Sequence, residues 1–94
     1  MDPLICNNRE NILMLAKKNG IKNVRVFGSM ANNNATMNSD VDFLVELEKD
    51  KTGFALGGFL MDVSDLLHRQ IDVITENALH SRIHDQVMQE AVKL

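Results

Sequence analysis

The segment 41–47 limits the fold more than any other part of the sequence, because apolar residues alternate along it. A period of two is typical of a β-strand with one buried face, since successive side chains on a strand point to opposite sides. The apolar face would carry Val41, Phe43, Val45 and Leu47. The other face would carry Asp40, Asp42, Leu44, Glu46 and Glu48. Such a strand needs a sheet beside it and another layer over its apolar face.

Other patterns predict the elements around this strand. Apolar residues recur at helical spacing in three segments, which are 3–18, 54–68 and 79–92. Two further short apolar segments, 21–27 and 70–75, are typical of strands. Residues 30–38 are small and polar, and we expect one short helical turn and then a loop there. The order predicts an α/β (α+β) domain with a small sheet flanked by helices, and it leaves the direction of each strand open.

Length and charge narrow the class of protein. The chain has 94 residues, so we expect one domain over 1–94. Its net charge of -3 argues against general attraction to nucleic acid or membranes, so a polyanionic substrate would need metal ions or a local positive site. Cys6 is the only cysteine, which excludes an internal disulfide and favours a reducing cytoplasm. No apolar run is long enough to span a membrane, and the first residues lack the basic and apolar regions typical of a signal peptide, so we expect neither a membrane span nor a signal peptide.

Asp40 and Asp42 are unexpected within or beside an apolar strand, where aspartate is unfavourable. Residues two apart face the same way, so two like charges would stand side by side unless a cation lay between them. Asp72 lies in the short strand 70–75, and the three carboxylates would converge if the two strands were neighbours. Oxygen ligands of this kind suit Mg²⁺, and two such ions can clamp the oxygens of a phosphoryl displacement. The alternative for Asp40 is turn chemistry together with Ser39.

Gly28 and Ser29 directly follow the strand 21–27. A glycine lets the backbone approach a phosphate closely, and the serine hydroxyl can donate a hydrogen bond to it. Taken alone the pair indicates only a turn. The chain has no Walker A motif and no dinucleotide-binding glycine motif.

Together, Val26-Phe27-Gly28-Ser29, a ten-residue gap and the segment from Asp40 to Val45 resemble the signature of the DNA polymerase β-like nucleotidyltransferase superfamily. Within it, the chain is most similar to the minimal nucleotidyltransferases (MNT) of bacteria and archaea. The resemblance covers nearly the whole chain and implies a nucleotidyltransferase-like fold with a small mixed sheet.

The resemblance implies a role for each matching residue. Gly28 and Ser29 match the phosphate-binding turn of the family. Asp40 and Asp42 match its metal-binding pair. Asp72 matches its third carboxylate, which helps to hold a metal and accepts the proton of the acceptor hydroxyl. The implied reaction uses ATP as substrate and two Mg²⁺ ions, and transfers AMP to an acceptor with release of pyrophosphate. The implied partner is a small helical toxin of the HEPN type, to which this chain would be the antitoxin. The antitoxin would neutralise the toxin by adding AMP to one of its tyrosines.

One stretch departs from the family pattern. Many relatives carry an Arg-Ala-Arg-Gly-like sequence after Gly-Ser, whereas this chain has Met30-Ala31-Asn32-Asn33-Asn34. Asparagine donates hydrogen bonds but lacks the charge and the bidentate geometry of arginine. A non-catalytic module that neutralises its partner by contact is therefore the alternative, and a metal-dependent phosphodiesterase ranks last. A homodimer or a hetero-oligomer would suit so small a chain.

Two further charged residues lie on predicted strands. Arg25 alternates outward, and we expect it to be solvated. Glu46 lies on the same face as Asp42 and is expected to be a solvated strand-end charge or a group that supports the ligands.

Overall fold

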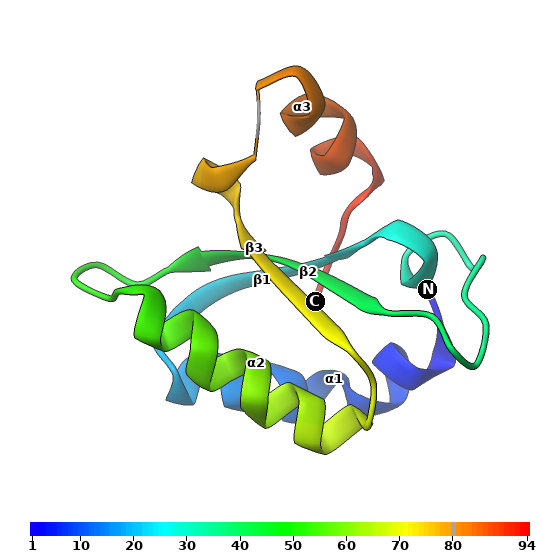
Figure 1. Ribbon diagram of the computed structural model, residues 1–94, viewed down its shortest axis with the longest axis horizontal. Coiled ribbons are helices and arrows are strands. Elements are labelled where there is room, and N and C mark those ends of the chain that lie inside the picture. The colour runs from blue at the N-terminus through cyan, green and yellow to red at the C-terminus, as the bar shows by residue number, and fades with distance from the viewer. Residues whose placement is uncertain (80) are drawn as a thin grey trace.

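The computed structural model describes residues 1–79 and 81–94, which form a mixed sheet with helices on both faces (Figure 1). In chain order the elements are α1 (Pro3–Lys18), β1 (Ile21–Phe27), the 3₁₀ turn η1 (Gly28–Met30), β2 (Val41–Leu47), α2 (Gly53–Leu67), β3 (Ile71–Thr75), the 3₁₀ turn η2 (Glu76–Ala78), α3 (Ser81–Glu90) and β4 (Val92–Lys93). The strand order is β3-β2-β1-β4. β2 and β3 are parallel, and β1 is antiparallel to both β2 and β4. The predicted α/β (α+β) fold class with a small mixed sheet is confirmed.

The apolar face of the sheet packs against α1 and α2, which lie side by side beneath it (Figure 1). Val41, Phe43 and Val45 of β2 are fully buried there, as their alternation predicted. The ring of Phe43 meets the ring of Phe59 from α2 edge to face, with centroids 5.6 Å apart. This layer fixes which side of β2 faces the core, and therefore sends Asp42 to the opposite side.

The opposite face of the sheet is covered only in part, by α3 and the turn η2 (Figure 1). Leu44 is completely buried yet lies outside the main core cluster, because it points to this second face. The described part of the chain has no helix long and apolar enough to cross a membrane.

The last predicted helix is wrong at its C-terminal end. We expected a helix over 79–92, but α3 ends at Glu90 and Val92–Lys93 form the edge strand β4. Val92 pairs with Val26, and the backbone N–H of Leu94 donates to the carbonyl of Val24 at 3.0 Å. The free edge of β1 offers backbone partners and a buried position for Leu94, and this long-range pairing overrides the helical pattern.

Candidate functional site

Gly28 lies where β1 ends against the polar side of β2. Its φ of +70° is in the left-handed region, which favours glycine. A Cβ at this position would stand 2.6 Å from Oδ2 of Asp42, closer than real Cβ contacts allow. Phe27 is the register partner of Asp42 in the β1–β2 pair, which explains the proximity. The glycine therefore brings the Gly28–Ser29 turn against one of the predicted ligands.

The turn itself is firmly anchored. Met30 is buried at 1% exposure, and its carbonyl accepts from the backbone N–H of Asp2 at 2.8 Å. The backbone N–H of Ala31 closes the turn onto the carbonyl of Gly28 at 3.1 Å. Because its apolar end is fixed in the core, the Gly28–Ser29 backbone is held in place beside Asp42.

The structure brings Asp42 and Asp72 together from adjacent strands. They are register partners in the parallel β2–β3 pair, so both side chains leave the same face of the sheet. Asp40 lies two residues before Asp42, in the segment that enters β2. Asp72 and Asp40 are exposed, whereas Asp42 is half-buried.

The charges of these three residues act on one another. Burial raises the pKa of the Asp42 carboxyl above its usual value, and the negative charges of Asp72 and then Asp40 raise it further. Ionised Asp42 is thus disfavoured by its surroundings. A cation among these carboxylates would relieve the repulsion.

The donor set fits Mg²⁺ in its chemistry. Within 1–79 and 81–94, no three His, Cys, Asp or Glu side chains stand close enough together to hold a metal ion by themselves. Mg²⁺ does not require such a cage, because it usually binds one or two carboxylates together with water and substrate phosphates. Asp42 and Asp72, with Asp40 beside them and the Gly28–Ser29 turn against Asp42, meet that requirement.

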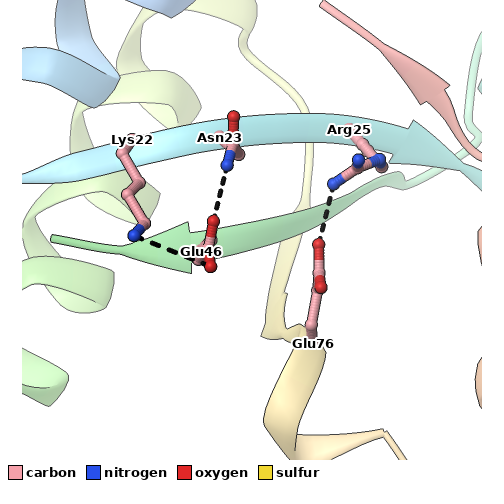
Figure 2. A network of polar contacts seen from close by, with 5 residues as sticks. All are labelled: Lys22, Asn23, Arg25, Glu46 and Glu76. Carbon is pink, nitrogen blue, oxygen red and sulfur yellow. Dashed lines mark hydrogen bonds and ion pairs between the residues drawn. The ribbon is translucent and has the colours of Figure 1, made fainter.

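Two ion pairs and a hydrogen bond lie further along the sheet from Asp42 (Figure 2). Asn23 donates a hydrogen bond to Glu46, and Nζ of Lys22 lies 3.7 Å from the Glu46 carboxylate. Glu46 is four residues beyond Asp42 along β2, about 13 Å away at ~3.3 Å per residue. It is a half-exposed charge near the strand end and lies too far away to support the ligands directly.

Arg25 is not solvated, contrary to the prediction. Its guanidinium donates to the carboxylate of Glu76 at 2.7 Å, and the two side chains are only 23% and 27% exposed (Figure 2). The reason is that η2 folds back over the sheet face on which Arg25 lies. No local pattern in β1 indicates a partner 51 residues away.

Two hollows lie apart from the carboxylates. One of about 240 Å³ is lined by the C-terminal end of β2, the last residue of β3 and the start of η2, and its carboxylates Glu46 and Glu76 are paired with Lys22 and Arg25. The other, of about 540 Å³, is an apolar surface on α2 around Phe54 and Met61. Since α2 covers the face opposite Asp42, this apolar hollow lies on the other side of the sheet from the Gly28–Asp42 site.

Comparisons with known proteins all indicate the same protein family. The model of the nucleotidyltransferase domain family matches residues 10–94. A protein of Methanocaldococcus jannaschii, described as a proposed protein adenylyltransferase, is 32% identical over 84 residues, which cover 89% of this chain and 90% of the relative.

Solved structures share the fold. One, described as a proposed minimal nucleotidyltransferase, has a TM-score of 0.87 at 35% identity and covers 100% of this chain and 97% of its own. Another contains a tri-AMPylated Shewanella oneidensis HEPN toxin in complex with an MNT antitoxin; its matching chain has a TM-score of 0.69 at 17% identity, with 94% of this chain and 69% of that chain covered. At that identity the second likeness shows the fold alone.

Replacement of Gly28 by alanine tests the close approach to Asp42. We expect Gly28→Ala to cost about 1–2 kcal/mol in the free energy of unfolding, because of its left-handed backbone, and to turn the Asp42 carboxylate away from its position. Gly57→Ala is the matched control: nothing lies within 4 Å of a Cβ there, and the helix should gain about 0.5–1 kcal/mol. Urea denaturation measures both, and equal effects would contradict the account.

Replacement of Asp42 by asparagine tests the charge repulsion. The pKa of Asp42 is higher in the folded state than in the unfolded state, so Asp42 contributes favourably to the free energy of unfolding at pH values below its unfolded-state pKa. This contribution is lost as the pH rises through the folded-state pKa. At pH 7 Asp42→Asn should therefore be more stable than the natural chain, on the scale of the ~0.5–2 kcal/mol that stabilising substitutions bring. The gain should shrink as the pH is lowered, while Mg²⁺ should stabilise the natural chain more than the variant.

The control for this experiment is Asp65→Asn, which removes an exposed carboxylate from α2 on the other side of the sheet. It should show neither the pH-dependent gain nor a change in the Mg²⁺ response. Denaturation curves at pH 7 and at the lowest pH that keeps all variants folded measure the difference. A loss of stability at pH 7 in Asp42→Asn would rule out the repulsion.

Proposed function

Because this chain belongs to the nucleotidyltransferase domain family, we propose that it transfers AMP from ATP, with Mg²⁺, to a hydroxyl group of a partner protein. The observation that carries this proposal is the meeting of Asp42, Asp72 and the Gly28–Ser29 turn at one end of the polar sheet face. The family assignment makes the chain an enzyme, and the description of its relative favours a protein as acceptor.

The proposed roles follow from the position of each group. Asp40 and Asp42 would hold metal, and Asp72, the register partner of Asp42 on the neighbouring strand, would contribute a third carboxylate. Backbone N–H groups and the hydroxyl of the Gly28–Ser29 turn bind phosphate oxygens. Bound Mg²⁺ supplies positive charge that neutralises the triphosphate and the charge developing in the transition state.

The bond changes involve ATP, the acceptor hydroxyl and Asp72. The acceptor oxygen forms a bond to the α-phosphorus of ATP, and its proton passes to the carboxylate of Asp72. The bond between the α-phosphorus and the oxygen that bridges to the β-phosphate breaks. Its electron pair leaves with pyrophosphate, and AMP remains on the acceptor.

A HEPN-type helical protein is the proposed partner, with a tyrosine as the acceptor. The chain itself contains no tyrosine, so an acceptor of that type must come from another molecule. The structurally similar complex of an MNT antitoxin with a tri-AMPylated HEPN toxin supports this choice. Asp72 is exposed and its register partner Asp42 is half-buried, so an acceptor can approach this pair from the face of the sheet away from α1 and α2. Figure 1 shows α3 and η2 on that same side of the sheet. In this proposal the chain acts as the antitoxin.

The alternative function is neutralisation by contact alone, and the loop after Ser29 favours it. Asn33 has φ +64°, and the side chain of Asn32 accepts from the backbone N–H of Asn34 at 3.2 Å. These asparagines thus stabilise the conformation of their own loop. Asparagine adopts the left-handed backbone conformation seen at Asn33 at a lower energetic cost than most other residues. They bring no positive charge to the phosphates.

Intact-mass spectrometry of the HEPN-type partner separates the two functions. After incubation with the chain, ATP and Mg²⁺, we expect a gain of one or more AMP units on the partner. Asp42→Asn should abolish the gain without loss of partner binding, whereas Asp65→Asn should retain it. A stable complex with no gain of mass would overturn the transferase proposal and favour neutralisation by contact.

A further inference from the structure

Asp40 lies in a segment without regular structure, so its position depends on what holds that segment. Residues 31–40 connect the turn η1 to β2 and contain neither helix nor strand. Asp40 itself is exposed. A ligand in such a segment would be poorly placed unless neighbouring groups fix its backbone.

The end of this segment forms a closed turn. The backbone N–H of Thr36 donates to the Ser39 hydroxyl at 2.8 Å, and the backbone N–H of Ser39 donates back to the carbonyl of Thr36 at 3.2 Å. The turn therefore behaves as a unit that ends immediately before Asp40.

Arg69 holds that unit from outside. Its Nη1 donates to the carbonyl of Ser39 at 3.0 Å and to that of Thr36 at 3.3 Å. On the other side of Asp40, the backbone N–H of Val41 donates to the carbonyl of Gln70 at 2.9 Å. Asp40 is thus flanked on both sides by hydrogen bonds to residues 69–70, and β3 carries Asp72 only two residues later.

We propose that Arg69 is a positioning residue that fixes Asp40 relative to Asp72, through its hydrogen bonds to the Thr36–Ser39 turn. This inference rests on the proposed function, because it gives Asp40 the task of holding metal. Arg69 touches backbone carbonyls rather than a reacting group. Its positive charge strengthens both bonds, and it ties the loop to the strand that bears the third carboxylate.

The test compares Arg69→Ala and Arg69→Lys with Arg9→Ala. Arg9 is the control, since its guanidinium also donates to a main-chain oxygen, that of the last residue Leu94 at 3.0 Å, away from Asp40, Asp42 and Asp72. The first readout is the Mg²⁺ concentration that gives half-maximal thermal stabilisation in the presence of a non-hydrolysable ATP analogue. The second is hydrogen exchange of the backbone amides over residues 36–41.

Arg69→Ala should raise the Mg²⁺ midpoint about 10–100-fold, the usual effect of losing a group that orients a metal ligand. It should also speed exchange at 36–41. Arg69→Lys should show a smaller rise in the Mg²⁺ midpoint and a smaller increase in exchange than Arg69→Ala, because an ammonium group also donates to carbonyls. Arg9→Ala should leave both within about twofold of the natural chain, even where its melting temperature falls.

The outcomes distinguish this inference from the proposed function. A natural chain that responds to Mg²⁺ and an Arg69→Ala variant with the same midpoint would overturn the role of Arg69 and leave the transferase standing. A natural chain with neither Mg²⁺-dependent stabilisation nor AMP transfer would remove the proposed function and this inference with it. Equal midpoint shifts in Arg69→Ala and Arg9→Ala would reduce Arg69 to a general stabilising contact.

Discussion

The in-register parallel pairing of β2 and β3 places Asp42 beside Asp72, and the rest of the site depends on that pairing. Burial and two neighbouring negative charges raise the pKa of Asp42, so the arrangement costs stability when no cation is present. The core tolerates this cost because the same strand turns Val41, Phe43 and Val45 into the layer formed with α1 and α2. One strand thus provides the apolar face that stabilises the fold and the polar face that is suited to bind metal.

The segments around the polar face confine the candidate site to one end of the sheet. Gly28 closes against Asp42 with no room for a side chain, while Arg69 and Gln70 hold the residues on either side of Asp40. At the other end, Glu46 and Glu76 are engaged by Lys22, Asn23 and Arg25 (Figure 2). Among the described residues of the polar face, no basic side chain is paired with Asp42 or Asp72. A chain of net charge -3 can therefore accept a triphosphate there through a cation.

Periodicity predicted the elements that bury a continuous face, and failed where long-range contacts decide. The alternation at 41–47 and the helical spacing at 3–18 both correspond to observed elements, β2 and α1. β4 has two residues and no pattern of its own, and it forms because β1 offers a free edge. The burial of Arg25 depends on Glu76, and the clamp on Asp40 depends on Arg69, 30 residues from Ser39. The pattern alone also left open the parallel direction of β3, which sets Asp72 beside Asp42.

Anomalous X-ray scattering from Mn²⁺ can show whether a metal ion binds between the carboxylates of Asp42 and Asp72. Crystals of the chain grown with Mn²⁺ and a non-hydrolysable ATP analogue would locate the metal without relying on activity. We expect an anomalous peak between the carboxylates of Asp42 and Asp72, with the phosphates of the analogue directed toward Gly28 and Ser29. A peak at Glu46 and Glu76, or a nucleotide bound with no metal near Asp42, would contradict it.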